Sequence, residues 1–255
     1  MTRSGGSSHG PSATGSRTGE IILQAAERFG TGVREFEHAT EERPSLWERL
    51  SDTKRRYVTY VEAVIFELVV QGDIVLSGRG APFSLQRVRH VLRVRVTAPE
   101  SLRAERLGLG IDAGTDLVRH SDRERASRVK FLYNVDWDAP LLYDLVLNTE
   151  RLDVPGSVRL IRQALEQGRF QSTPDSLATA RDLGLAARAR AALLLDPLTQ
   201  DLQVAITCEN GVVSMSGRVA QREQRAVVEE TIGRFPGVTK VLSDITVLPP
   251  PGIGV

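Results

Sequence analysis

The first part of the chain has hydrophobic residues at helical spacing. Residues 20–30 place apolar side chains three and four positions apart and end at glycine, which predicts an amphipathic helix. Ser45, with Glu48 three positions later, forms a capping box and predicts a second helix. We expect this helix to break or bend near Ser51 and Asp52. A long helix with apolar and aromatic residues on its inner face follows, so this region has enough apolar surface for a core.

Three short apolar runs come next, and each is bounded by turn-forming or acidic residues, which predicts β-strands. The runs cover residues 73–77, 90–97 and 144–148. Helical patterns separate them, at about 100–107, 113–133 and 154–167. Apolar strands that alternate with helices are typical of a parallel sheet covered by helices.

The pattern changes after residue 170. Residues 171–176 are mostly polar and contain Pro174, which predicts a linker. The elements expected after it are a helix at 177–195, strands at 202–208 and 212–216, a helix at 220–234 and a strand at 238–247. Asn210-Gly211 joins the first two strands and is a strong hairpin signal. This α-β-β-α-β order is complete, so we expect residues 177–248 to form a separate small domain.

Composition excludes several classes of protein. Residues 1–19 are rich in glycine, serine and threonine, residues 249–255 are rich in proline and glycine, and we expect both to be disordered. The formal charge of +1 argues against a nucleic-acid partner. The single cysteine, Cys208, excludes an intrachain disulfide, and the histidines have no ligand spacing, so no metal site is expected. No segment is apolar enough for a membrane span or a signal peptide, so we expect a cytoplasmic protein without a membrane partner.

Several short motifs recur in a recognisable order in the C-terminal region. They are Asn210-Gly-Val-Val213, Ser216-Gly-Arg-Val219, and Pro236-Gly-Val238 leading to residues 244–247. With the element order, they make about residues 178–248 resemble a BON domain. BON domains are binding modules, so the resemblance implies a protein partner for this region.

Six motifs mark residues 20–167. They are Ala25-Ala-Glu-Arg-Phe-Gly30, Glu42-Arg-Pro-Ser45, Val75-Leu-Ser-Gly-Arg-Gly80, Val94-Arg-Val-Thr-Ala-Pro99, Ser121-Asp-Arg-Glu-Arg125 and Tyr143-Asp-Leu-Val-Leu-Asn-Thr149. In this order they resemble the cytidylate-kinase-like family, a branch of the nucleoside monophosphate kinases. The resemblance implies a nucleotide-binding α/β fold.

Arg79, between Gly78 and Gly80, directly follows a predicted strand. Ligands of open α/β sheets bind beyond the carboxyl ends of strands, and a guanidinium group binds phosphate in a bidentate way. The resemblance implies that Arg79 faces the phosphate of a nucleoside monophosphate; a surface arginine in a tight turn is the alternative. Asp144, at the start of the last strand, is a further candidate ligand contact.

Arg119, Asp122 and Arg125 recur every three residues and therefore share one stripe of a predicted helix. The resemblance implies that this stripe is a lid whose arginines neutralise charge on the transferring phosphoryl group. A solvated helix face with ion pairs along the helix remains the alternative. Arg93 and Arg95 alternate with apolar residues on a strand, and we expect ion pairing or partial exposure for them rather than ligand binding.

The chain contains no Gly-x-x-x-x-Gly-Lys-Ser/Thr loop, the element that cradles a nucleoside triphosphate in related kinases. Either Gly15-Ser-Arg-Thr-Gly19 is a degenerate form of that loop, or the family's first strand, loop and helix have no counterpart here. The implied fold class is α/β: an incomplete P-loop-kinase-like parallel sheet with helices, plus a small α-β-β-α-β domain. In it, the strands at 73–77 and 90–96 must pair directly or accept another segment between them.

These observations favour a nucleotide- or phosphate-binding protein that is a catalytically impaired pseudokinase with a BON interaction module. The first alternative is an active CMP kinase, using ATP and Mg²⁺, whose phosphate loop lies upstream of residue 1. The second alternative is an interaction scaffold without a ligand.

Overall fold

The computed structural model describes residues 18–29, 47–78 and 80–249. Most of the expected N-terminal tail, Ser45 and Arg79 lie outside the described residues. The expected tail of residues 1–19 is too long at its end, because Thr18 and Gly19 form the start of the first helix.

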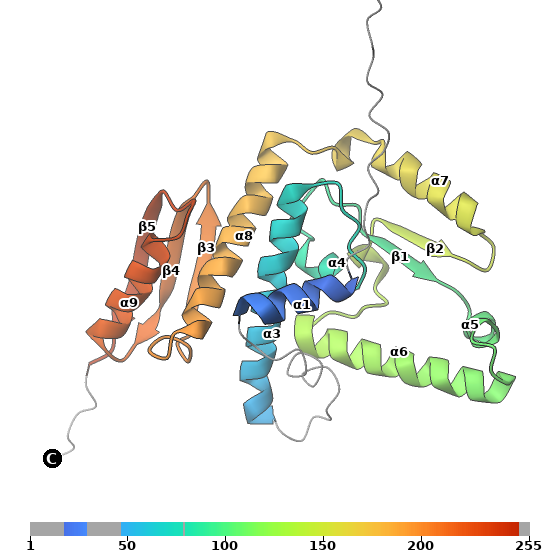
Figure 1. Cartoon of the computed structure of the whole chain (residues 1–255), viewed down its shortest axis with the longest axis horizontal. Helices are drawn as coiled ribbons and strands as arrows, with labels where there is room; N and C mark the ends of the chain where they lie inside the picture. Colours follow the sequence, from blue (N-terminus) through green and yellow to red (C-terminus); the bar gives the residue numbers. More distant parts are fainter. Residues whose placement is uncertain (1–17, 30–46, 79, 250–255) are drawn as a thin grey trace, which may run out of the picture.

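The N-terminal region is a helical layer around a small sheet (Figure 1). Its helices are α1 (Thr18–Phe29), α3 (Trp47–Gln71), α4 (Ala81–Ser84), α5 (Glu100–Arg106), α6 (Ile111–Tyr133) and α7 (Val154–Leu165), with 3-10 turns η2 (Pro140–Leu142) and η3 (Gly168–Phe170). Its strands are β1 (Val94–Thr97) and β2 (Leu145–Asn148). α3 continues through Ser51 and Asp52 without the expected break, because neither residue is a proline or glycine and a kink needs such a cause.

The sheet of this region is parallel and shorter than expected. β1 pairs with β2 in the register Val94 to Leu145 through Thr97 to Asn148. The strand expected at 73–77 is wrong, since the structure has only a single bridge residue, Val75, in that segment. Among the described residues no further strand lies beside it, so nothing extends the bridge into a ladder. The fold is nevertheless the α/β arrangement that the sequence predicts.

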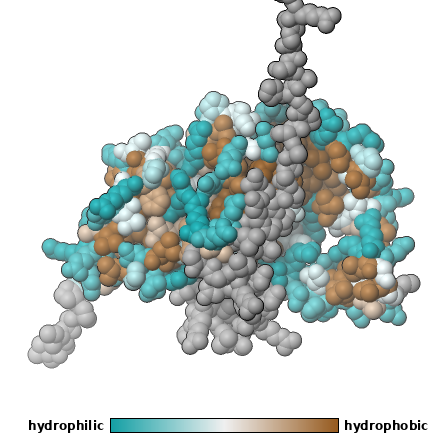
Figure 2. Space-filling model, viewed as in Figure 1, coloured by the Kyte–Doolittle hydropathy of each residue, from teal (hydrophilic) through white to brown (hydrophobic). Residues whose placement is uncertain are grey.

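The incomplete sheet leaves apolar side chains in contact with solvent. Parallel strands are normally covered on both faces, yet Val96 is 62% and Val146 46% exposed. Val154 and Val158 of the nearby α7 are exposed as well. Figure 2 shows hydrophobic surface on the right of the molecule, where Figure 1 places β1, β2 and α7. By the register of the two strands, Val96 and Val146 lie on opposite faces of the sheet, and Leu147, which shares the face of Val96, is buried. Each face of the described sheet is therefore only partly covered.

The C-terminal region has the predicted order of elements. They are α8 (Pro174–Leu195), β3 (Val204–Glu209), β4 (Val212–Val219), α9 (Arg222–Gly233) and β5 (Lys240–Val247). The strand order is β3-β4-β5, with β3 antiparallel and β5 parallel to β4. The side chain of Thr173 caps α8 by accepting from the N–H of Ser176, so the first turn of this helix falls within the predicted linker 171–176.

α8 has two buried faces and belongs to two cores. One face, with Ala180, Ala187 and Leu194, packs into the core formed around α1 and α3. The other face packs against the three-stranded sheet. Figure 1 shows α8 between α3 and that sheet. A Cβ on Gly184 would lie 3.2 Å from the Cβ of Phe66, so glycine here permits the close approach of the two helices.

Two half-buried arginines strengthen the contact of α3 with α8 and the three-stranded sheet. Arg190 of α8 lies 3.7 Å from the carboxylate of Glu62 in α3 and donates to the carbonyl oxygen of Ile206 in β3 at 3.0 Å. Burial raises the pKa of Glu62, and the nearby guanidinium of Arg190 opposes that shift. Arg55 of α3 donates to the carbonyl oxygens of Gln200 and Leu202, just before β3. The two regions therefore form one packed body.

None of the helices in the described ranges combines the length and the hydropathy needed to cross a bilayer.

Candidate functional site

The turn expected to bind phosphate has a glycine at each end in the left-handed conformation. Gly78 has a φ of 75° and Gly80 a φ of 77°. A Cβ on Gly80 would lie 2.0 Å from the phenolic oxygen of Tyr133, so only glycine fits against this side chain. Burial raises the pKa of Tyr133, which therefore stays neutral. Arg79 lies between these glycines and outside the described residues, so its role stays a prediction.

Aromatic rings connect this turn to the neighbourhood of the β1–β2 sheet. The ring of Phe83 lies 5.3 Å from that of Tyr133 and 6.5 Å from that of Tyr143. The hydroxyl of Tyr143 donates to the carbonyl oxygen of Trp137 at 2.8 Å. Tyr133, Phe83 and Tyr143, here called the aromatic row, thus connect Gly80 with the segment that follows α6.

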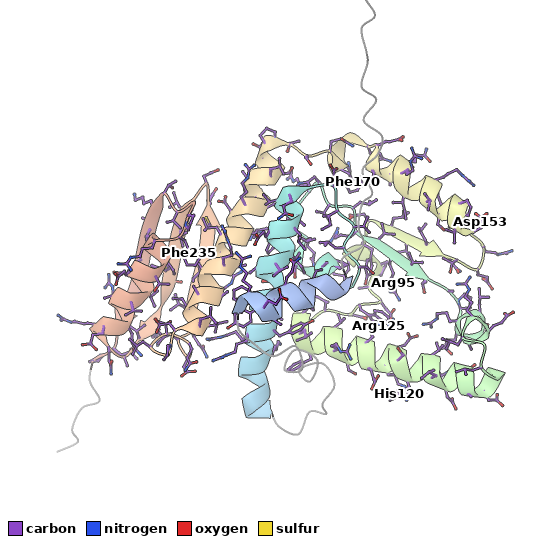
Figure 3. The ribbon with its side chains drawn as sticks, in the orientation of Figure 1. Arg95, His120, Arg125, Asp153, Phe170 and Phe235 are labelled. Atoms are coloured by element: carbon purple, nitrogen blue, oxygen red, sulfur yellow. The ribbon has the colours of Figure 1, made fainter. Side chains whose placement is uncertain are left out.

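Two guanidinium groups lie against the indole of Trp137. The guanidinium carbon of Arg95, from β1, is 5.0 Å from the ring centroid, and that of Arg125, from α6, is 5.4 Å away. Figure 3 shows the two arginines approaching each other from these two elements. Arg95 also donates to the carbonyl oxygen of Trp137 at 3.1 Å and forms an ion pair with Asp138. The ion pairing expected for Arg95 is therefore present.

Arg125 differs from Arg95 in its polar contacts. Its guanidinium has no hydrogen-bond acceptor among the described residues, although its face is in contact with the indole. A guanidinium stacked on an aromatic ring keeps its edge available for bidentate hydrogen bonds to an oxyanion. The cluster of Trp137, Arg95 and Arg125, here called the indole cluster, therefore offers an aromatic surface and a cation to a phosphorylated ligand.

The other two lid-like residues are held by α5. Arg119 Nε lies 2.8 Å from Glu100 Oε2, and Arg103 grips both oxygens of Asp122 at 2.8 and 2.6 Å. The hydrogen bond from Arg103 lowers the pKa of Asp122. These partners lie on a neighbouring helix, so the stripe is not simply a solvated face. Among the described contacts of these three residues, that of Arg125 is the one with the ring of Trp137.

Asp144 is occupied by a single partner. Its carboxylate accepts from the backbone N–H of Arg93 at 2.8 Å and from the guanidinium of Arg93 at 3.0 and 2.9 Å. Burial alone would raise the pKa of Asp144, but these hydrogen bonds hold it below its usual value. The expected pairing of Arg93 is present, and the carboxylate ties the start of β2 to the start of β1. A ligand contact at Asp144 stays a prediction.

The sequence did not identify Trp137, Tyr143 or Phe83 as site residues. For Arg95 the sequence predicts ion pairing or partial exposure rather than ligand binding. The available signal was an aromatic residue between two acids, Asp136 and Asp138, directly after an arginine-rich helix. An indole that stacks with a guanidinium is a common partner for such arginines. Within the described part of the chain, no cluster of histidine, cysteine and acidic side chains has the geometry to hold a metal ion.

The elements above define an α/β protein with a second, smaller α-β-β-α-β domain, and comparison with known proteins specifies the class. Residues 16–151 match the cytidylate kinase-like family, and residues 181–249 match the BON domain. The chain belongs to the cytidylate kinase-like family and has a C-terminal BON domain.

Its curated relatives include archaeal proteins named cytidylate kinase. The one from Methanocaldococcus jannaschii is 30% identical over 154 residues, which is 58% of this chain and 80% of the relative. Those from Methanopyrus kandleri and Methanococcus aeolicus are 26% identical over 160 residues and 29% identical over 153 residues. Each alignment covers 58% of this chain, with 77% and 80% of the respective relative.

Proposed function

We propose that the chain is a cytoplasmic protein that binds a nucleoside monophosphate such as CMP at the indole cluster. The observation that carries this proposal is Arg125, which stacks on Trp137 while its donors have no acceptor among the described residues. The free donors of Arg125 suit the phosphate of a nucleotide, and the indole ring beside them suits its base. Arg79, between Gly78 and Gly80, supplies a second guanidinium to the phosphate, and the aromatic row links the two places.

The proposal includes impaired catalysis. Phosphoryl transfer needs a backbone cradle for the triphosphate and arginines free to neutralise the transferring charge. The 255 residues contain no Gly-x-x-x-x-Gly-Lys-Ser/Thr loop. Arg119 and Asp122 are engaged by α5, and the exposed Val96 marks a sheet without a further described strand. We therefore propose a pseudokinase whose BON domain binds a partner protein.

An active CMP kinase that uses ATP with Mg²⁺ is the second candidate. The observation in its favour is the similarity to proteins named cytidylate kinase over 77–80% of their lengths. A protein of this kind forms CDP from CMP in steady turnover, whereas a pseudokinase does not.

The test of nucleotide binding is a titration of CMP into the full chain, followed by heat release and by the thermal midpoint, which rises when a ligand binds the folded state. The Arg125→Gln variant is expected to bind CMP about tenfold more weakly, because a charge-assisted hydrogen bond contributes roughly 1.5–3 kcal/mol. Arg79→Ala is expected to weaken binding by a similar factor.

Arg123→Gln is the matched control. Arg123 lies on the same helix, is exposed, and among the described residues donates to the carbonyl oxygen of Arg119 alone. Equal affinities of the Arg125 and Arg123 variants would place the ligand elsewhere. No binding of CMP, dCMP or ATP with Mg²⁺ would leave a scaffold without a nucleotide, and CDP formation would establish the active kinase.

A further inference from the structure

The three-stranded sheet of the C-terminal domain has two edges with different surroundings. At the β3 edge, Arg190 of α8 donates to the carbonyl oxygen of Ile206, and α3 supplies Arg55 to the segment just before the strand. β5, at the other edge, makes no backbone hydrogen bond within the described residues apart from those to β4. Figure 1 places β5 and α9 at the end of the molecule distant from α6. An uncovered edge of this kind is a template for another strand.

A cavity of about 610 Å³ runs along the free edge. Its walls are a stripe of α9, formed by Arg222, Arg225, Ala226 and Glu229, and residues 245–247 of β5. Successive side chains of a strand point to opposite faces. A cavity on one face of the sheet would contact every second residue of the strand. Because three consecutive residues line this cavity, it lies beside the edge of β5. The space between α9 and β5 is therefore an open groove beside the strand edge.

The groove has an apolar floor and a positive rim. Ile245 is buried, and Val247 and the small side chain of Ala226 lie beside it. Arg225 is neutralised by Glu229, whose carboxylate lies 2.8 Å away. Arg222 is exposed and makes no ion pair or hydrogen bond with any described residue. One cation is thus left for a partner.

We propose that this groove binds an extended acidic segment of a partner protein, which pairs with β5 as an added strand and places a carboxylate on Arg222. Backbone hydrogen bonds to a sheet edge supply affinity in such complexes, and side-chain contacts supply specificity. Alternate side chains of the segment cover Ala226 and Val247. A second copy of this chain is the alternative occupant, and the test below distinguishes it by its oligomeric state.

This inference rests on the proposed role of the C-terminal domain as a protein-binding module and is independent of the nucleotide site. CMP binding without peptide binding refutes this inference alone. Peptide binding without CMP binding refutes the nucleotide proposal alone.

The test uses the full chain and a set of heptapeptides of alternating threonine and valine, each with one glutamate at a different position. A matched set carries glutamine instead. We expect at least one glutamate peptide to bind and to slow amide hydrogen exchange in β5, while exchange in β3 is unchanged. The glutamine counterpart is expected to bind about tenfold more weakly.

Two variants identify the cation. Arg222→Gln is expected to weaken binding of the glutamate peptide by about tenfold, whereas Arg218→Gln, an exposed arginine on β4 outside the groove, is expected to change it less than twofold. The inference is overturned if no peptide binds, if both variants bind equally, or if protection appears away from β5. Peptide-independent dimerisation through β5, or binding only to vesicles of phosphatidylglycerol, would also overturn it.

Discussion

At the scale of single residues, three aspartates hold separate parts of the chain together. Asp122 joins α6 to α5 through Arg103, and Asp144 joins β2 to β1 through Arg93. Asp182 of α8 accepts the backbone N–H groups of Asn210 and Gly211 at 2.7 and 3.0 Å and so fixes the hairpin between β3 and β4.

The same carboxylate of Asp182 affects the pKa of the single cysteine, Cys208. Cys208 Sγ lies 3.2 Å from Asp182 Oδ1. Burial, together with this carboxylate, raises the pKa of the Cys208 thiol to about 12. Since the thiolate is the reactive form, we expect Cys208 to stay an unreactive thiol at neutral pH.

The lowered pKa of Asp122 predicts a loss of stability in acid. A carboxyl group with a lower pKa in the folded state than in the unfolded state contributes stability above the unfolded value of about 3.9. This contribution disappears as the pH falls through the folded value. We expect the difference in unfolding free energy between wild type and Asp122→Asn to be largest near neutral pH and to shrink in acid, measured by denaturant unfolding across that range.

Asp116→Asn is the control for this experiment, because Asp116 is exposed on the same helix and has no ion pair among the described residues. A constant difference between Asp122→Asn and wild type at every pH would contradict the prediction.

At the scale of elements, local pattern predicted most of the secondary structure. Amphipathic spacing located α6 and α7, and the Asn210-Gly211 turn located the β3–β4 hairpin, because these signals are local. The strand at 73–77 was wrong because a strand needs a neighbour, which no local pattern supplies. The packing of α8 on α3 was not predictable either, since the alanines that form it also suit an exposed helix.

For the candidate site, too, the sequence predicted local spacing but not contacts between distant segments. The stripe of Arg119, Asp122 and Arg125 followed from helical spacing, and its partners on α5 did not, because they depend on tertiary packing. Trp137 is brought close to Arg95 and Arg125 by the return of the chain after α6. β1 and that segment are far apart in the sequence, so no local pattern predicts that they meet.

The close packing of α8 on α3 makes Gly184 sensitive to size. We expect Gly184→Leu to lower the unfolding free energy by about 1–3 kcal/mol, because the added side chain must displace Phe66 and overpacking has this effect. Thermal and denaturant unfolding measure it. Gly233→Ala in α9 is the control, since its nearest neighbour, a Val241 methyl, lies 4.0 Å away at ordinary contact distance. Similar losses in the two variants would show that space at Gly184 is not the cause.

At the scale of the whole molecule, α8 lies between the two hydrophobic cores and contributes side chains to both. The BON domain has its own core, which includes Leu185, Val213 and Ile232. The opposite face of α8 packs, within the described ranges, against the kinase-like region. The domain boundary expected at 171–176 stays a prediction of where the chain can be divided.

This arrangement predicts that Ala187→Glu acts differently in two contexts. Ala187 is fully buried in the full chain, so the charge is expected to destabilise it by about 3 kcal/mol or more. In a fragment of residues 174–249, which we expect to fold, the same position faces solvent and the effect is expected to stay within about 0.5 kcal/mol. Melting curves of the four proteins measure this. Equal destabilisation in both contexts would place Ala187 inside the BON core.

Because α8 belongs to both cores, the first core cannot be completed on the ribosome until α8 has been synthesised. α3 is complete once Gln71 has been made, but the helix that covers it ends about 120 residues later, at Leu195. At common elongation rates this interval is about 6 to 25 seconds. During that time the side of α3 that α8 covers, with residues such as Phe66, has no partner in the growing chain, and we expect it to be a binding site for chaperones that recognise nascent hydrophobic segments.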